Sequence, residues 1–261
     1  MAGVPEPTRP AADGDLPLAG LILDWGGVLT APLDDAMRAW AERDRIDFEH
    51  FRDVLVGWAD PVAAPGGSRS GVAAVEAAED PVAAVEQVPG PVASSAAFTP
   101  VHRLERGEIS PAEFERVLAG ELGARGSRVE PEGLLDRMLG DLAELSDDML
   151  GLVVRARRAG LCTALLSNSW GDHYPDALFQ GLFDSVVISG RVRMRKPEER
   201  IFLHTARELG LAPGQCVMVD DLPGNVHAAV AAGMGGVLHR NYQQTAEELE
   251  ILFGIPLATA S

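Results

Sequence analysis

The sequence predicts an α/β fold built on a parallel β-sheet, because short apolar runs alternate along the chain with segments that carry helix signals. The apolar runs show no polar alternation and are bounded by Gly, Pro or Asp, as is typical of strands buried on both faces. The expected strands cover residues 19–23, 161–166, 185–189, 216–219 and 236–239. In a doubly wound sheet of this kind, functional residues lie at the carboxyl ends of the strands.

The connecting segments show where helices begin and end. Ser146 is suited to cap a helix that stops at Gly160, because its hydroxyl can accept hydrogen bonds from the first free N–H groups. The expected helices over residues 197–209 and 223–232 are each followed directly by glycine, the usual residue after a helix C-terminus. Strand and helix therefore alternate through the C-terminal half of the chain.

Residues 31–145 form an excursion between the first two expected strands that is too long for a simple crossover. Its expected helices cover residues 34–45, 48–58, 101–106 and 111–122. The last of these starts with a capping box, Ser110-Pro111-Ala112-Glu113. We therefore expect residues 31–145 to form a helical cap, inserted into an α/β core of residues 19–30 and 146–261.

Two segments are expected to lack a packed core. Residues 59–97 form a low-complexity insertion in which Asp-Pro-Val-Ala-Ala occurs twice and large side chains are few. Such a segment offers too little apolar surface to fold tightly. Residues 1–18 are rich in Pro, Ala and Asp. They are expected to form a disordered tail, since they lack the basic and apolar pattern of a secretory signal.

The composition limits the possible partners. A net charge of −17 argues against nucleic acid and against anionic membrane surfaces, and no apolar run approaches the roughly 20 residues that cross a bilayer. Cys162 and Cys216 lie in apolar runs and favour buried thiols in a reducing cytoplasm. An anionic substrate would need a metal ion or a focused positive group in so acidic a protein. The oligomeric state stays open.

The first expected strand leads into Asp24-Trp25-Gly26-Gly27. A carboxylate that leaves a buried strand before paired glycines stands beside free backbone N–H groups in a tight loop. Such N–H groups, including that of Gly27, can bind phosphoryl oxygens while the carboxylate attacks. A purely structural interpretation is also open, because Asp often ends a strand as a turn former.

The single lysine of the chain, Lys196, stands among 22 basic residues. An ammonium is a compact charge that can sit between two anions, whereas a planar guanidinium needs a bidentate partner and more room. The sequence accepts arginine everywhere else, so this position is a candidate for a specific role between anions. The alternative is a surface cation without a role.

Two further strand ends carry polar residues. The fourth expected strand leads into Asp220-Asp221, and adjacent acids are electrostatically costly unless a cation joins them. Hard oxygen ligands suit Mg²⁺, although acids also decorate ordinary helix N-termini. The second strand leads into Ser167-Asn168-Ser169, where a hydroxyl and the next amide can hold an anion; the same residues are common in turns.

Taken together, the order Asp24, Ser167, Lys196 and Asp220-Asp221 over alternating strands resembles the haloacid dehalogenase superfamily of aspartate-nucleophile hydrolases. The resemblance is strongest to the branch that contains the phosphatase domain of soluble epoxide hydrolases and related bacterial phosphatases. It covers about residues 18–239 without the insertion. The supporting runs are Phe183-Asp184, Ile188-Ser189-Gly190, Arg195-Lys196-Pro197-Glu198, Ile201-Phe202, Val219-Asp220-Asp221 and the cap stretch 104–110.

This resemblance implies a Rossmann-like core with a helical cap, and a Mg²⁺-dependent phosphatase that acts on a small phosphorylated metabolite. Asp24 would attack phosphorus in line and form an aspartyl-phosphate, which water later hydrolyses. Mg²⁺ would be held by the Asp24 carboxylate, the backbone carbonyl of Gly26 and Asp221, with Asp220 bound directly or through water.

The same resemblance assigns the residues around the phosphoryl group. Ser167 and the amide of Asn168 would hold phosphoryl oxygens. Lys196 would offset the charge between the nucleophile and the phosphate. Asn225 would orient Lys196. Trp170 and the cap helices would shape the leaving-group pocket.

The chain departs from the superfamily pattern at Gly26. Phosphatases of this superfamily usually carry a second aspartate there, two residues after the nucleophile, which protonates the leaving group and then activates water. General acid–base help is typically worth about 10²–10⁴ in rate. The sequence therefore predicts a phosphatase that favours good leaving groups, or a weak one.

Two other functions stay open. A catalytically weak or inactive binding or regulatory protein would explain Gly26 simply, but it would not explain why Asp24, Lys196 and both acids are present. A 2-haloacid dehalogenase also attacks with aspartate and needs no acid for halide departure. It needs no metal, however, and would have little use for Asp220-Asp221.

Overall fold

A computed structural model of the chain describes residues 17–59, 99–140, 145–171, 174 and 179–258. Most of the expected tail and nearly all of the low-complexity insertion lie outside these residues. Within the described ranges, the helices are all too short or too polar to cross a membrane.

Five parallel strands form the sheet in the spatial order β3-β2-β1-β4-β5. The strands are β1 (Gly20–Leu23), β2 (Cys162–Ser167), β3 (Ser185–Ile188), β4 (Cys216–Asp220) and β5 (Gly235–Leu238). The predicted parallel α/β sheet is confirmed, and each strand lies within a residue or so of its predicted position. The order places β1 in the centre, between β2 and β4, where the direction of winding changes.

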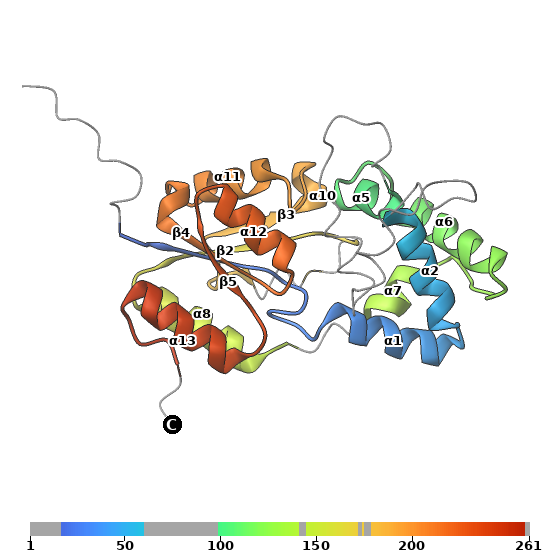
Figure 1. The fold of residues 1–261 in the computed structure, drawn as a ribbon, viewed down its shortest axis with the longest axis horizontal. Helices are drawn as coiled ribbons and strands as arrows, with labels where there is room; N and C mark the ends of the chain where they lie inside the picture. Colours follow the sequence, from blue (N-terminus) through green and yellow to red (C-terminus); the bar gives the residue numbers. More distant parts are fainter. Residues whose placement is uncertain (1–16, 60–98, 141–144, 172–173, 175–178, 259–261) are drawn as a thin grey trace, which may run out of the picture.

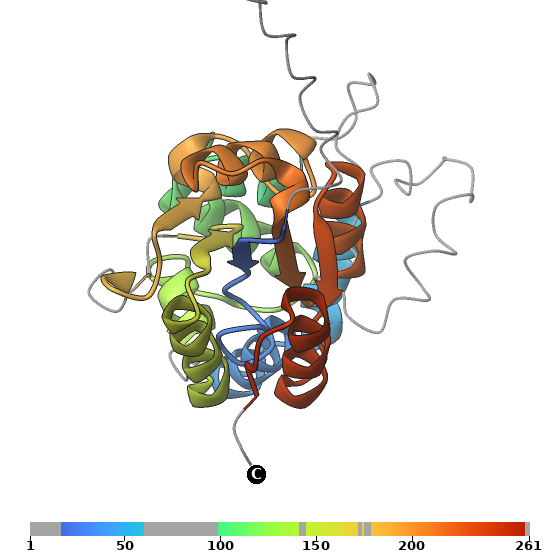
Figure 2. The ribbon, with the colours of Figure 1, turned by 90° about the vertical axis from the view of Figure 1, so that its left-hand side faces the viewer.

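Helices cover both faces of the sheet, as Figures 1 and 2 show. One face packs against α8 (Asp147–Arg158) and α13 (Tyr242–Phe253), and the other against α11 (Glu199–Glu208) and α12 (Pro223–Ala231). The remaining elements of the core are the short helices α10 (Ser189–Val192) and η3 (Pro213–Gln215). The predictions from sequence included the helices corresponding to α8, α11 and α12 but not α10 or α13.

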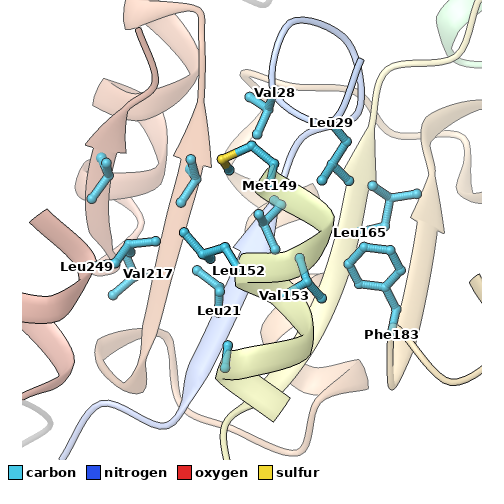
Figure 3. Close-up of a cluster of buried hydrophobic side chains, with 14 of the residues drawn as sticks. Leu21, Val28, Leu29, Met149, Leu152, Val153, Leu165, Phe183, Val217 and Leu249 are labelled. Carbon is cyan, nitrogen blue, oxygen red and sulfur yellow. The ribbon is translucent and has the colours of Figure 1, made fainter. Parts of the chain in front are cut away.

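Alternation along β1 explains why its run is apolar throughout. Leu21 and Leu23 belong to the hydrophobic cluster beneath α8 and α13, whereas Ile22 belongs to the cluster beneath α11 and α12. Successive side chains of a strand point to opposite faces, so a strand covered on both sides is apolar at every position. Figure 3 shows α8 lying over β1 with Leu152 and Val153 directed at the sheet. Each fully buried leucine contributes about 1.5–3 kcal/mol, which fixes the strand ends in position.

A second group of helices lies at one end of the core, between β1 and β2 in the chain (Figure 1). Its members are α1 (Leu33–Asp44), α2 (Phe48–Ala59), α5 (Pro100–Glu105), α6 (Pro111–Ala124) and α7 (Leu134–Leu139). They share a hydrophobic cluster of their own around Trp40, Phe51 and Phe114. We call this group the cap. The two chain segments that join it to the core run side by side, because Thr30 and Leu145 form an antiparallel bridge.

Candidate active site

The sheet order brings the predicted strand-end residues to one edge. Leu23 of β1 pairs with Leu165 of β2 and with Val219 of β4. The residues that follow these pairs therefore leave the sheet at nearly the same level. They are Asp24 at the end of β1, Ser167 at the end of β2, and Asp220 with Asp221 at the end of β4.

Lys196 lies between two of these carboxylates. Its Nζ is 2.8 Å from Asp24 Oδ1 and 2.7 Å from Asp220 Oδ2. The side chain is 1% exposed, so the alternative of a surface cation is wrong. Burial disfavours the charged ammonium, but the charges of Asp220 and Asp24 outweigh it and raise the pKa of Lys196. This is the geometry that a compact ammonium can satisfy and a guanidinium cannot.

Three carboxylates meet at the same place. One oxygen from each of Asp24, Asp220 and Asp221 lies within 4.8 Å of the others. Burial raises the pKa of Asp24 to about 7, with Lys196 opposing the shift and Asp220 adding to it. Burial, together with Asp220 and Asp24, raises the pKa of Asp221 to about 8. Three acids and one lysine leave a deficit of positive charge, and a donor set of hard oxygens fits Mg²⁺.

The two glycines after Asp24 and Trp25 differ in the space around them. Gly27 has φ +69°, and a Cβ there would lie 2.0 Å from Asp221 Oδ2. A side chain at this position would therefore displace a carboxylate of the acidic cluster, which explains the requirement for glycine. A Cβ on Gly26 would meet nothing within 4 Å. A larger side chain would fit at Gly26, so its identity is not dictated by packing.

The two asparagines predicted to bind substrate have structural contacts in the site. The side chain of Asn168 donates to the Lys196 carbonyl at 3.0 Å and accepts from the Lys196 N–H at 2.8 Å. It therefore fixes the backbone that carries the ammonium. Asn225 Nδ2 donates to Asp220 Oδ1 at 3.0 Å, and the Leu222 N–H donates to the same oxygen at 3.0 Å. In the described contacts, Asn225 thus orients Lys196 through Asp220 rather than directly.

Tyr174 was not foreseen from the sequence. Its Oη lies 2.9 Å from Ser167 Oγ, and its ring packs against Trp25, with the ring centroids 5.8 Å apart. Trp25 directly follows Asp24, and its N–H donates to Asp24 Oδ1 at 2.6 Å. Tyr174 stands five residues after Ser167-Asn168-Ser169, in a stretch whose sequence shows no periodicity. The sequence therefore did not predict these contacts.

Two cap residues bind the segment around Lys196, and they were also not foreseen. Glu105 at the end of α5 accepts a hydrogen bond from Arg195 Nε, and both side chains are fully buried. The other oxygen of Glu105 accepts from Trp170 Nε1 at 3.1 Å. The neighbouring cap residue, Arg106, donates through Nε to Glu198 Oε1 at 2.7 Å. The cap therefore binds the chain on both sides of Lys196. Before Lys196 the cap supplies the anion, and after it the cap supplies the cation.

Comparison with known proteins agrees with this geometry. The sequence pattern of haloacid dehalogenase-like hydrolases matches residues 18–233, and the chain belongs to this family of hydrolases. A sesquiterpene phosphatase of Aspergillus oryzae is 26% identical over 160 residues, which are 58% of this chain and 78% of that protein. Mouse bifunctional epoxide hydrolase 2 is 30% identical over 114 residues, which are 41% of this chain and 21% of that protein. Two other curated relatives are matched over only 10% and 24% of their own lengths.

The fold also has relatives among solved structures. A haloacid dehalogenase family enzyme from Bacteroides thetaiotaomicron, solved with magnesium and inorganic phosphate, aligns with a TM-score of 0.51 and 19% identity. The alignment covers 85% of this chain and 94% of that one. At this level of identity the likeness is one of fold. The predicted family and fold are thus confirmed.

Proposed function

We propose that the protein is a Mg²⁺-dependent phosphatase of small phosphate esters that works through an aspartyl-phosphate on Asp24. The observation that carries the proposal is the position of Lys196, buried between Asp24 and Asp220, beside a third carboxylate from Asp221. A nucleophilic carboxylate held by a lysine suits attack on an anionic phosphoryl group, because the lysine offsets the repulsion between two anions. Relatives named as phosphatases support the same reaction class.

Asp24, Asp220, Asp221 and the carbonyl of Gly26 are the groups that we assign to the metal. When bound, Mg²⁺ would neutralise charge on the phosphoryl oxygens. Ser167 and the backbone N–H groups of Asn168 and Gly27 would hold the remaining phosphoryl oxygens. Attack by Asp24 forms the new O–P bond as the bond to the leaving oxygen breaks. Water then attacks the phosphorus and regenerates the carboxylate.

The empty space at Gly26 bears on the substrate. No carboxylic acid stands there to protonate the leaving oxygen, and its absence can reduce the rate by about 10²–10⁴ for a poor leaving group. In acyl phosphates and anomeric phosphates, the oxygen that leaves phosphorus is a good leaving group and departs readily without a proton donor. We therefore assign small phosphorylated metabolites with good leaving groups as substrates, and we place the enzyme in the cytoplasm, in keeping with its free cysteines.

The other two functions fit the site less well. An inactive binding protein would not need the lysine and three acids to converge. A dehalogenase would gain nothing from Asp221 beside Asp24, since halide departure needs no divalent ion.

Turnover of an aryl phosphate with and without Mg²⁺, in the wild type and in Asp24→Asn, tests the proposal. We expect activity that requires Mg²⁺ and is lost in the variant. Activity that survives chelation, or that persists in Asp24→Asn, would rule the mechanism out. Release of chloride from 2-chloropropionate would instead identify a dehalogenase. If both assays are silent while Mg²⁺ still binds, the protein is an inactive homologue.

Gly26→Asp tests the assignment of leaving groups. Because a Cβ there meets nothing within 4 Å, the variant should fold, and its carboxyl group should raise turnover of alkyl phosphates more than that of aryl phosphates. Gly26→Ala is the matched control, since it occupies the same space without an acid. Equal turnover of alkyl phosphates by Gly26→Asp and Gly26→Ala would show that another group already supplies the proton.

A further inference from the structure

We propose that Tyr174 is a positioning residue of the phosphoryl site that acts by orienting the hydroxyl of Ser167. The inference rests on the proposed function, because it takes Ser167 as a donor to a phosphoryl oxygen. The contact that carries it is the 2.9 Å separation between Tyr174 Oη and Ser167 Oγ. In the described part of the chain, this is the shorter of the two hydrogen bonds of the Ser167 side chain.

A serine hydroxyl has one hydrogen and two lone pairs, and it rotates to suit its neighbours. Ser167 is 3% exposed. The other hydrogen-bond partner of its hydroxyl among the described residues is the Asn168 carbonyl, which lies 3.4 Å away, a distance at which a hydrogen bond is weak. If the Tyr174 O–H donates to Ser167 Oγ, the serine hydrogen is not used on the phenol and can be donated to a phosphoryl oxygen. The tyrosine thus determines the direction in which the serine donates.

The surroundings of Tyr174 favour the role of donor. Burial raises the pKa of Tyr174 to about 12, with the negative charge of Asp24 adding to the shift and the hydrogen bonds with Ser167 and Ser169 opposing it. The phenol therefore keeps its proton through the neutral range. Tyr174 would act only through its hydrogen bond, and no covalent or proton-transfer step is assigned to it.

Two aromatic rings, those of Trp25 and Phe179, hold Tyr174 in place. Its centroid lies 5.8 Å from that of Trp25 and 6.2 Å from that of Phe179, and Trp25 lies 5.4 Å from Phe179. These separations are typical of stabilising aromatic pairs. Trp25 is the residue after the nucleophile, so Tyr174 is in aromatic contact with the direct neighbour of Asp24. The hydroxyl of Tyr174 is therefore fixed relative to both Asp24 and Ser167.

The variant Tyr174→Phe removes the hydroxyl and keeps the ring. A net hydrogen bond is worth about 0.5–1.5 kcal/mol, which corresponds to about a 2- to 12-fold change. We expect kcat/KM for an aryl phosphate to fall by this factor in a variant that still folds. Tyr242→Phe is the matched control, since its hydroxyl also takes part in a side-chain hydrogen bond, accepting from Arg155 Nη2 at 2.9 Å. This control should leave kcat/KM unchanged.

A double-mutant cycle separates positioning from a general structural effect. If Tyr174 acts through Ser167, then Tyr174→Phe should change nothing in a Ser167→Ala background. Additive losses in the double variant would overturn the inference, as would wild-type kcat/KM in Tyr174→Phe. Binding of inorganic phosphate with Mg²⁺, followed by tryptophan fluorescence, should show the same pattern. A wild type that neither hydrolyses the ester nor binds phosphate would overturn the proposed function together with this inference; the other outcomes concern Tyr174 alone.

Discussion

Arg195 and Lys196 are consecutive, fully buried cations that face opposite parts of the molecule. Arg195 reaches the cap, where its Nε donates to Glu105, and its two outer nitrogens, Nη1 and Nη2, have no hydrogen-bond partner in the described residues. Lys196 reaches the sheet edge and contacts two carboxylates. The arginine joins two packed regions and the lysine completes a charged site. The comparison shows that two equally buried cations can differ in the number and kind of their anionic partners, and this difference is what makes Lys196 the candidate site residue.

The comparison predicts the largest effect at Lys196. Lys196→Arg should lower kcat/KM by about 10²–10³, the range found when a group that stabilises transition-state charge is removed, because a guanidinium cannot fit between Asp24 and Asp220. Arg207→Lys is the control, since it exchanges the same two residue types at an exposed position. It should leave kcat/KM unchanged. Activity of Lys196→Arg near that of the wild type would show that any cation suffices at this position.

For a substitution of Arg195 we expect a lower free energy of unfolding rather than a direct loss of catalytic activity. Arg195→Met leaves the buried Glu105 without its cation, and breaking a buried ion pair in this way costs about 3–5 kcal/mol. Urea unfolding measures this change in free energy of unfolding. Combining Arg195→Met with Glu105→Gln removes the uncompensated charge and should recover most of the loss. A double variant as unstable as the single one would contradict this account of the pair.

The metal-free site should make stability depend on pH in an unusual direction. The pKa values of Asp24, about 7, and of Asp221, about 8, lie above those of an unfolded aspartate, near 3.9. Between about pH 4 and pH 8 the folded chain holds protons that the unfolded chain has released, so stability falls as pH rises. Mg²⁺ favours the deprotonated carboxylates and should restore about 2.7 kcal/mol at a hundred times its Kd.

Urea unfolding at pH 5.5 and pH 8, with a chelator or with Mg²⁺, measures both effects. Asp221→Asn is the informative variant, because it removes one of the two carboxyl groups whose pKa is raised. It should reduce both the fall with pH and the stabilisation by Mg²⁺. Equal stability of the chelated wild type at the two pH values would argue against a shared acidic site.

The sequence predicted the core of this site because its residues follow strands. Asp24, Ser167 and Asp220 each end an apolar run, and parallel order alone brings such positions to one edge. Helix α13 was missed even though Asn241 caps it, with its side chain accepting from the Gln244 N–H at 3.0 Å. Helix α7 is only six residues long, which is too short for a period to be recognised.

The contacts that surround the site could not be predicted in the same way. Glu105 and Arg195 are 90 residues apart, and they meet only because α5 of the cap packs against the core. Tyr174 itself belongs to no described helix or strand, so no period predicts the direction of its side chain. Local patterns fix elements and strand ends, whereas contacts between a cap and a loop depend on tertiary packing.

The smallest predicted effect concerns the ion pair between Arg106 of the cap and Glu198. Comparing it with the exposed pair between Arg200 and Glu198 shows how much burial adds to the stability that an ion pair contributes. Glu198 accepts from Arg106 and from Arg200, each at 2.7 Å, but the Arg106 side chain is 5% exposed and the Arg200 side chain 57%. These contacts outweigh burial and lower the pKa of Glu198. The stabilisation is therefore present above the unfolded pKa and is lost as pH falls through the folded value.

Arg106→Gln should cost about 1 kcal/mol at pH 7, and Arg200→Gln, its exposed match, only a few tenths, because solvent screens the exposed pair. Both differences should shrink as the pH of urea unfolding is lowered through the folded pKa of Glu198. If the two variants lose equal stability at pH 7, contact distance rather than burial decides what an ion pair contributes here. If the cost of Arg106→Gln does not change as the pH is lowered through the acid range, Arg106 stabilises the cap through its other contacts, including its hydrogen bond to the His102 carbonyl, and not through the carboxylate.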